Sequence, residues 1–565
     1  MMNYSQAHIC QGLSRIATVK RNSVVTISGN RRKTGEQLVQ SVLSLARGLL
    51  QQGLRSGDIV AICAFNSEWY LEWILAVAYI GGIVAPLNYR WSFEEASMAM
   101  TTIRPVMLVT DESCHSWNSE LQGNAIPSLR WHVTLGSPSF VFMNTWNIST
   151  TDIIKEHSPR SPPLNYSWAP AGAVIICFTS GTTGRPKGVT ISHSALIVQS
   201  LAKIAVVGYG EEDVYLHTAP LCHIGGLSSA MAMLMVGACH VLIPKFEAKS
   251  ALEAIEKHCV TSLITVPAIM TDLITLIRVK KTWKGRDSVK RILNGGGGLS
   301  IELTKEATSF FPRAKLLSAY GMTETCSSLT FMTIYDPTIE TPGQLPQTSC
   351  KMKYNSVQQP QGVCVGRPAP HVELKICVDG SSHVGKILTR GPHVMLRYWD
   401  QNLAKMPSDS NDEVWLDTGD IGSIDDGGNV WLIGRRNGRI KSGGENVYPE
   451  EVEAILLQHP GVTAIVIVGI PDARLTEMVV GCVKVRKNWL WSDNNVEQSA
   501  ESKELVLSSE VLRQHCREKN LTGFKIPKIF ISWRRPFPVT TTGKIRRDEV
   551  QREVVSRLKC LPSKL

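Results

Sequence analysis

The feature that most restricts the fold is a regular alternation of short apolar runs with helical patterns, between residue 24 and about residue 330. Runs rich in β-branched residues lie at residues 58–62, 106–109 and 173–178, and a helical pattern covers residues 42–54. Alternating strands and helices favour parallel sheets whose faces are covered by helices. We therefore expect α/β layers over this part of the chain.

A second unit is expected toward the C-terminus. The chain has 565 residues, several times the usual size of one domain. After Gly434 a new pattern begins, with an apolar run over residues 462–468 and a helical pattern over residues 509–518. These observations predict a large α/β domain followed by a small α+β domain.

The charge of the chain does not indicate a nucleic-acid-binding protein. The net charge is +11, but the basic residues are scattered and form only short clusters such as Arg31-Arg32-Lys33. No long basic block with interleaved aromatic residues occurs, as a nucleic-acid surface would require. An enzyme that handles polyanionic small molecules explains the same charge.

Two apolar stretches, residues 69–86 and 224–244, are long enough to be checked as membrane spans. The first contains Glu72 and a glycine pair, and the second contains His240 and several glycines. Each is better explained as a buried helix that runs into a buried strand. We expect no transmembrane segment.

A loop rich in glycine and hydroxyl residues follows the apolar run at 173–178 and precedes a helical pattern that begins at His193. Its backbone N–H groups, hydroxyls and lysine can surround a polyphosphate. The Walker pattern Gly-x-x-x-x-Gly-Lys-Ser/Thr is absent, which argues against the P-loop NTPase fold. The loop reads Thr179-Ser180-Gly181-Thr182-Thr183-Gly184-Arg185-Pro186-Lys187-Gly188.

This decapeptide closely resembles the signature of the adenylate-forming superfamily, which contains acyl-CoA synthetases, peptide-synthetase adenylation domains and beetle luciferases. Four further motifs of that family follow in the right order, so the resemblance spans nearly the whole chain. They are Tyr320-Gly321-Met322-Thr323-Glu324, Leu416-Asp417-Thr418-Gly419-Asp420, the region from Gly434-Arg435 to Asn446, and Pro538 to Arg546.

The resemblance implies an adenylate-forming fold and an ATP-dependent acid–CoA ligase. A large N-terminal domain of α/β layers would cover residues 1–436, and a small, mobile α+β domain would cover residues 437–565. The expected substrates are a small-molecule carboxylic acid, ATP and coenzyme A, with Mg²⁺ as the metal. The acid would first form an acyl-adenylate with release of diphosphate, and coenzyme A would then displace AMP.

The resemblance also implies roles for the residues that handle the phosphates. Thr323 would hydrogen-bond the α-phosphate, and Glu324 would bind Mg²⁺, which prefers hard oxygen ligands. Lys544 would bridge the attacking carboxylate and the α-phosphate. The β- and γ-phosphates would lie within the loop residues Thr179, Ser180, Gly181, Thr182, Thr183, Gly184 and Lys187.

The remaining family positions concern the nucleoside and coenzyme A. Tyr320 would stack on adenine, and Asp420 would accept hydrogen bonds from the ribose, with Arg435 beside it. Asn437 would be the hinge residue, where relatives usually carry Asp or Lys. The pantetheine tunnel would be lined by Lys441, Ser442, Gly443 and Gly444.

The acyl pocket is assigned to two segments, one carrying His223 and Ser228 and the other carrying Gly296 and Gly297. Many relatives have Ala-Pro where this chain has Gly297-Gly298, so the pocket wall is expected to recede. Residues 86–91 and 217–226 look most like the plant ligases that activate 2-succinylbenzoate for phylloquinone (vitamin K1) biosynthesis. A peroxisomal ligase for a cinnamate-type or fatty acid is the alternative.

Two roles stay open for His223. It can be a polar partner of the ring carboxylate of 2-succinylbenzoate, together with Ser228, or a satisfied core imidazole.

The chain carries signals for two compartments. Ser563-Lys564-Leu565 at the end of the sequence matches the tripeptide read by the peroxisomal import receptor. No acidic residue precedes Glu36, whereas several basic residues do, which is a bias typical of transit peptides. We expect a peroxisomal protein that is also addressed to the chloroplast.

Overall fold

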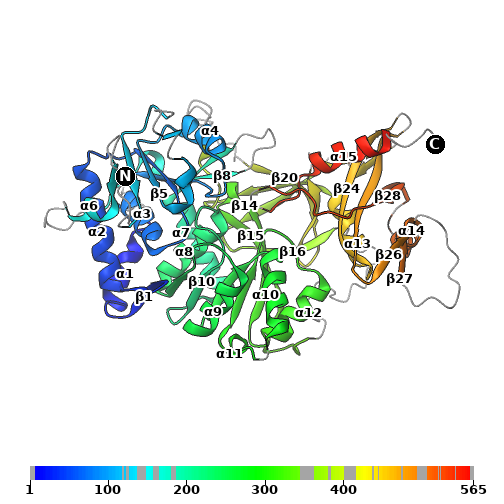
Figure 1. Cartoon of the computed structure of the whole chain (residues 1–565), viewed down its shortest axis with the longest axis horizontal. Helices are drawn as coiled ribbons and strands as arrows, with labels where there is room; N and C mark the ends of the chain where they lie inside the picture. The colour runs from blue at the N-terminus through cyan, green and yellow to red at the C-terminus, as the bar shows by residue number, and fades with distance from the viewer. Residues whose placement is uncertain are drawn as a thin grey trace. The chain divides into compact units, whose positions relative to one another are not determined.

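The computed structural model divides the chain into two compact units (Figure 1). The larger unit falls within residues 1–352, 366–373 and 390–414, and the smaller unit within residues 353–365, 374–389 and 415–565. The residues that the structure describes are 7–117, 120–121, 126–136, 148–156, 165–179, 186–280, 282–343, 362–378, 383–399, 415–435, 438–442, 445–472, 475–492, 505–519, 521, 523–540 and 543–559.

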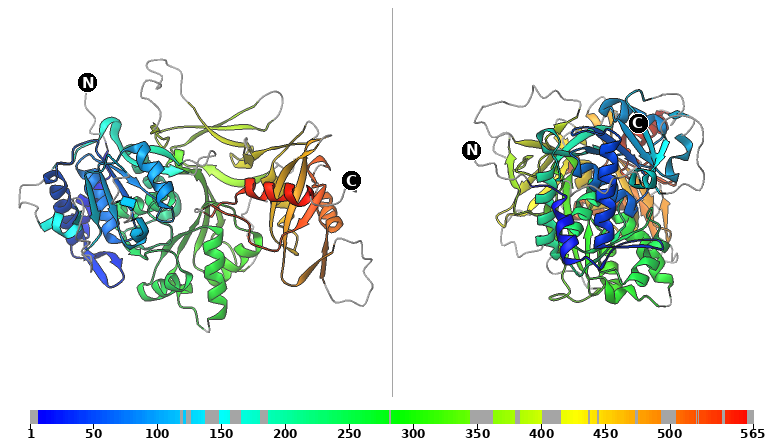
Figure 2. Two further views of the ribbon diagram at one scale, coloured as in Figure 1. Left: turned by 45° about the horizontal axis from the view of Figure 1, so that its top comes forward. Right: turned by 90° about the vertical axis from the view of Figure 1, so that its left-hand side faces the viewer.

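The first sheet of the larger unit contains the strands predicted near residues 60, 107 and 175, and Figure 2 shows most of it in blue and cyan. Most of its strands pair in parallel, whereas β8 pairs antiparallel with β9, and β9 with β19. The strand order is β19 (Arg397–Tyr398), β9 (Lys187–Ser192), β8 (Ala173–Thr179), β4 (Ile83–Pro86), β3 (Ile59–Cys63), β5 (Met107–Thr110), β6 (Trp131–Thr134) and β7 (Ile148–Thr150).

Helices cover both faces of this sheet, as parallel strands require. Val60 and Ile62 of β3 belong to the core that also contains α2 (Gly35–Gln51) and α3 (Glu68–Tyr79). The alternate residues of β3 face the other way and pack with α4 (Phe93–Ile103). The expected α/β layering is therefore confirmed.

The second sheet of the larger unit is also mainly parallel. It is covered on one face by α9 (Ala248–His258), α10 (Pro267–Val279) and α12 (Ile301–Phe310). Its strands within this unit are, in spatial order, β15 (Ser327–Tyr335), β14 (Lys315–Met322), β13 (Arg291–Asn294), β12 (Ser262–Thr265), β10 (Val214–His217), β11 (Cys239–Leu242), β1 (Val24–Ser28) and β2 (Arg31–Thr34).

Both apolar stretches form a buried helix followed by a buried strand, as predicted. The first becomes α3 and β4, and the second becomes α8 (Ile224–Val236) and β11. In the part of the chain that the structure describes, none of the helices has the length and apolar character needed to cross a bilayer.

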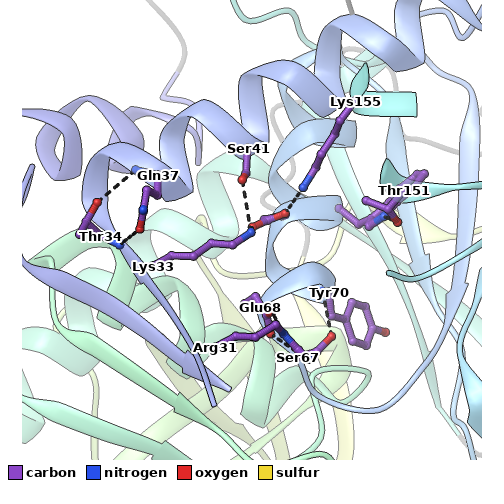
Figure 3. A network of polar contacts seen from close by, with 12 residues as sticks. Arg31, Lys33, Thr34, Gln37, Ser41, Ser67, Glu68, Tyr70, Thr151 and Lys155 are labelled. Atoms are coloured by element: carbon purple, nitrogen blue, oxygen red, sulfur yellow. Dashed lines mark hydrogen bonds and ion pairs between the residues drawn. The ribbon is translucent and has the colours of Figure 1, made fainter. Parts of the chain in front are cut away.

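Glu72 of α3 joins three elements of the larger unit through buried ion pairs. Its side chain is 0% exposed and pairs with Lys33 of β2 and with Lys155 of α6 (Thr151–Glu156), the latter over 2.5 Å. Lys33 and Lys155 reach this carboxylate from separate elements (Figure 3). Lys33 of the cluster Arg31-Arg32-Lys33 thus forms an ion pair within the larger unit.

The smaller unit is built around the antiparallel pair β24 (Val462–Asp472) and β25 (Thr476–Val485). One face of β24 packs with α13 (Pro449–Leu456) and α14 (Ser509–Glu518), and the other packs with α15 (Arg547–Lys559). Figure 1 shows α15 in red beside β24. The unit also contains β17 (Glu373–Cys377), β18 (Gly385–Arg390), β20 (Leu416–Ile424), β21 (Val430–Arg435), β22 (Ile440–Ser442), β23 (Glu445–Val447), β26 (Trp489–Ser492), β27 (Leu505–Ser508) and β28 (Ile529–Ser532).

Candidate active site

The two ends of the phosphate loop are held together by a β-hairpin. Thr179 ends β8 and lies opposite Lys187, the first residue of β9. The chain therefore returns as a strand before α7 (His193–Lys203) begins at the predicted residue. Ser180, Gly181, Thr182, Thr183 and Gly184 lie outside the described residues.

Glu324 lies close to the strand that follows this loop. It belongs to the 3₁₀ turn η4 (Thr323–Thr325) and is 8% exposed. Tyr398 of β19 donates a hydrogen bond to Oε1 of Glu324 over 2.9 Å, and Lys187 Nζ lies 5.5 Å from the centre of the Tyr398 ring. A carboxylate at its hydroxyl and an ammonium group over its ring thus lie near one tyrosine, a charge arrangement that suits a polyphosphate with a bound cation.

The turn that carries Thr323 and Glu324 has a constrained backbone. Cys326 and Ser327 both have positive φ, 53° and 109°, which residues with a Cβ rarely adopt. A Cβ at Gly321 would lie 1.6 Å from the carbonyl oxygen of Ser327, so only glycine fits there. Strain of this kind is often stored at functional sites.

Tyr320 lies on β14, opposite Thr330 of β15, and is half-buried.

In the smaller unit, Asp420 and Arg435 lie opposite each other on β20 and β21. Asp420 is 3% exposed, and its Oδ1 lies 3.2 Å from Nε of Arg435. The backbone N–H of Asp420 donates to the hydroxyl of Thr418, which in turn donates to the carbonyl of Ile387. The ion pair with Arg435 orients the carboxylate, and the two hydrogen bonds hold the strand that carries it.

Lys544 lies in a tight turn of the smaller unit. The backbone N–H of Thr540 donates to the carbonyl of Lys544 over 2.7 Å, and Gly543 has a φ of 81°. The pKa of Lys544 is lowered below its usual value, first because the amine loses part of its hydration and then because of the Arg435 guanidinium. The carboxylates of Asp420 and Glu450 act in the opposite direction.

The segment assigned to coenzyme A forms a short hairpin. Lys441 and Ser442 belong to β22, which pairs with β23, and Ser442 is buried. Gly443, Gly444 and the expected hinge residue Asn437 lie outside the described residues.

His223 precedes α8 directly and is half-buried. Burial lowers the pKa of His223 to about 4, and the positive charge of Arg90 contributes in the same direction. The imidazole is therefore neutral at neutral pH. It can offer a carboxylate a hydrogen bond, but it cannot neutralise the charge.

Ser228 lies one turn further along α8 and is completely buried. Its hydroxyl donates to the carbonyl of Ile224 and accepts a hydrogen bond from Lys203 over 2.7 Å. Among the pocket glycines, Gly296 has a φ of 68°, and a Cβ at Gly297 would lie 3.3 Å from the Pro267 ring.

Two residues of this region were not singled out from the sequence. Tyr398 lies far from residues 320–324 in the chain, and no motif marks it. Lys203 ends a helix whose other residues are mostly apolar, and only the structure shows that it is buried.

Comparison with known proteins places these features in one family. The profile described as AMP-binding enzyme matches residues 13–399, and the profile of the AMP-binding enzyme C-terminal domain matches residues 451–544. The chain belongs to the AMP-binding enzyme family. The chloroplastic/peroxisomal 2-succinylbenzoate–CoA ligase of Arabidopsis thaliana is 59% identical to the present chain over 573 aligned positions, and the alignment covers 100% of both chains.

Two further relatives are less similar to this chain. An indoleacetate–CoA ligase of Aromatoleum aromaticum is 30% identical, covering 92% of this chain and 93% of its own. A 2-succinylbenzoate–CoA ligase of Bacillus cereus is 28% identical, covering 87% and 88%.

Solved structures of such enzymes share the fold. The o-succinylbenzoate CoA synthetase of Bacillus subtilis, in complex with its acyl-adenylate intermediate, superimposes with a TM-score of 0.73 at 24% identity, covering 96% of this chain and 97% of its own. An anthranilate CoA ligase bound to anthranoyl-AMP gives a TM-score of 0.77 at 22% identity, with 98% of both chains covered. The fold of this AMP-binding enzyme is therefore that of the adenylate-forming enzymes, as predicted.

Proposed function

We propose that this protein is a 2-succinylbenzoate–CoA ligase of phylloquinone biosynthesis. The observation that carries the proposal is the 59% identity to the Arabidopsis thaliana ligase over the full length of both chains. The substrates are 2-succinylbenzoate, ATP and coenzyme A, and the products are 2-succinylbenzoyl-CoA, AMP and diphosphate.

In the first step, an oxygen of the succinyl carboxylate attacks the α-phosphorus of ATP, and the bond from this phosphorus to the diphosphate oxygen breaks. Two anions approach each other, so positive groups must lower the repulsion. We assign this role to Lys187 and Lys544, with Thr323 as a hydrogen-bond donor to the α-phosphate. The Glu324 carboxylate suits Mg²⁺, which neutralises phosphate charge when bound.

Asp420 and Arg435 hold the ribose in this proposal, and Tyr320 stacks on the adenine. The geometry that supports the assignment is the fixed position of the Asp420 carboxylate, which is buried beside Arg435. The loop residues 179–184 surround the β- and γ-phosphates.

In the second step, the thiol sulfur of coenzyme A attacks the acyl carbonyl carbon, the thiol proton is released, and AMP leaves with the electrons of the acyl–oxygen bond. AMP is a far better leaving group than oxide, which is the reason for the first step. We assign Lys441, Ser442, Gly443 and Gly444 to the pantetheine and Asn437 to the hinge between a domain of residues 1–436 and one of residues 437–565.

A thioester-formation assay with purified protein, ATP, Mg²⁺ and coenzyme A tests the function. Three acids are compared: 2-succinylbenzoate, coumarate and a medium-chain fatty acid. We expect thioester from 2-succinylbenzoate, with a kcat/KM at least about 100-fold above the other two, because a polar site strongly rejects acids that lack its partner group. A higher kcat/KM for coumarate or the fatty acid would reject the substrate and leave the ligase reaction in place.

We further propose that Ser563-Lys564-Leu565 is read by the peroxisomal import receptor and that the basic N-terminal region serves a chloroplast address. The Arabidopsis relative is named as a chloroplastic/peroxisomal enzyme, which supports both compartments. Deleting the tripeptide from a fluorescent fusion should remove the peroxisomal signal and leave activity in vitro unchanged. A peroxisomal signal that persists would contradict this assignment.

A further inference from the structure

The fold buries one lysine beside the acyl helix without an acidic partner. Lys203 is the last residue of α7 and is 0% exposed. Its amine donates hydrogen bonds to the hydroxyls of Ser228 over 2.7 Å and Ser229 over 3.0 Å. Within the described parts of the chain, no carboxylate forms an ion pair with it.

Such burial is costly, because an ammonium group without a counter-charge loses its hydration and gains no Coulomb attraction. The contrast within the chain is Lys525, which is also buried, at 7% exposed, but pairs with Glu451 over 2.8 Å. Burial lowers the pKa of Lys203 to about 7. The Lys203 amine thus has two hydroxyl acceptors and, among the described residues, no counter-charge.

Lys203 contacts the helix that carries part of the proposed acyl pocket. Ser228 and Ser229 lie on α8, the helix that follows His223. On another side, the buried thiol of Cys326 lies close enough to affect the amine, and Cys326 follows the turn of Thr323 and Glu324 directly. A π-helix, η3 (Ile204–Gly208), begins immediately after Lys203. Such helices are frequent at functional sites.

We propose that Lys203, Ser228 and Ser229 form a buried cationic subsite that holds the second carboxylate of a dicarboxylic acid. This inference rests on the proposed function, in which that group is the ring carboxylate of 2-succinylbenzoate. The two hydroxyls now donate to the carbonyls of Ile224 and Gly225, over 2.6 and 2.8 Å. They can rotate to donate to the carboxylate, while the lysine supplies the positive charge that the neutral His223 lacks.

Arg90 is the cation that acts on His223, but it is exposed. Water and salt screen its charge, so its pairing with a carboxylate contributes less than that of a buried amine. We therefore assign Lys203, and not Arg90, as the residue that determines the preference for a second carboxylate.

The subsite predicts a pH dependence that only the diacid shows. With a pKa of about 7, the free amine is increasingly neutral as the pH rises from 7 to 9. A bound carboxylate stabilises the ammonium form, so the Lys203 amine takes up a proton when the diacid binds, and the diacid binds more weakly at higher pH. The titratable groups packed around this site are Cys326 and Tyr215, and burial raises the pKa of both, so they stay neutral over this range.

The test compares 2-succinylbenzoate with 4-oxo-4-phenylbutanoate, which lacks the ring carboxylate, in wild type, Lys203→Met and Arg90→Gln. Lys203→Met should lower the preference for the diacid, as the ratio of the two kcat/KM values, by about 10- to 100-fold. Turnover of the monoacid should stay within about threefold, as expected for a group that contacts only the missing carboxylate. Lys249→Met, an exposed lysine on α9, is the control for loss of charge.

The same ratio in wild type should fall about tenfold for each pH unit above 7, within the range up to pH 9, because one proton is bound with the diacid. Equal losses of kcat/KM for both acids in Lys203→Met would show a purely structural lysine. An unchanged ratio of the two kcat/KM values in that variant would also overturn the proposal. So would a fall of this ratio that occurs only in Arg90→Gln. If Lys203→Met does not fold, Lys203→Gln and the wild-type pH profile decide it. A wild type inactive toward 2-succinylbenzoate but active toward another acid would reject the proposed function instead.

Discussion

The hydroxyl of Tyr398 donates a hydrogen bond to the carboxylate of Glu324 over 2.9 Å. Tyr398 lies on β19, which pairs with β9, the strand that begins at Lys187. The backbone N–H of Met395 also donates to the carbonyl of Glu324 over 2.9 Å. One segment, residues 395–398, therefore holds both the side chain and the backbone of Glu324, and the same segment pairs with the strand that follows the phosphate loop.

Glu324→Gln should slow acid-dependent pyrophosphate exchange by about 100-fold, the effect expected when one charged group is lost from a phosphoryl-transfer site. A neutral amide is also a poorer ligand for a hard cation, so more Mg²⁺ should be needed for half-maximal rate. Tyr398→Phe keeps the carboxylate and removes only its hydrogen bond, and we expect a loss below about tenfold. Identical Mg²⁺ titrations for wild type and Glu324→Gln would show that Glu324 is not the ligand.

Lys544→Ala should reduce formation of the acyl-adenylate by about 100- to 1000-fold, because the two reacting anions lose a cation between them. Thioester formation from supplied acyl-AMP should stay near the wild-type rate, since that step has no anionic nucleophile to bring against the α-phosphate. Lys528→Ala, an exposed lysine of the smaller unit, serves as control. Equal losses in both half-reactions would contradict a role limited to the first step.

Glu72→Gln should destabilise the larger unit by about 3–5 kcal/mol, because Lys33 and Lys155 would then face a buried neutral amide. The matched control is Glu36→Gln, which breaks the exposed pair with Arg21 and should change stability little. Urea unfolding followed by tryptophan fluorescence measures both. Similar midpoints for the two variants would mean that the buried pairs add no stability.

The closely packed, tilted imidazoles of His8 and His193 should make the fold sensitive to acid. Their ring centres lie 3.9 Å apart, and burial lowers the pKa of His193 to about 3, with His8 adding to the effect. Below its usual pKa of 6.5 the unfolded chain binds a proton that the folded chain cannot accept. Stability should therefore fall by about 1.4 kcal/mol for each pH unit below 6.5, through this residue alone.

The measurement is the urea midpoint at pH 7 and pH 5 for wild type and His193→Asn. The variant should lose less stability between these two values, because one titrating group is gone and an acceptor for the backbone N–H of Ile9 is kept. The difference between the two proteins therefore reports His193 together with its contact to His8. A larger acid loss in the variant would refute the account.

Much of the architecture follows from local pattern. The apolar runs near residues 60, 107 and 175 became β3, β5 and β8, and the helix predicted at residues 509–518 is α14. Strand and helix periodicities depend on neighbouring residues, so they can be read without knowledge of the tertiary contacts. The family motifs likewise lie in continuous segments. Their roles in binding ATP, Mg²⁺ and coenzyme A stay predictions that the variants above test.

Other features depended on contacts between distant parts of the chain. No spacing in the sequence shows that Tyr398 reaches Glu324, or that Lys33 and Lys155 share Glu72. Lys203 would be read from its sequence as one more surface lysine, since lysine is almost never buried without a partner. Only the packing of α7 against α8 removes it from water and sets it beside two serines. The sequence by itself determined the elements and the family, because both are local. The tertiary structure decided which charges are buried and paired, because burial is a property of the assembled core.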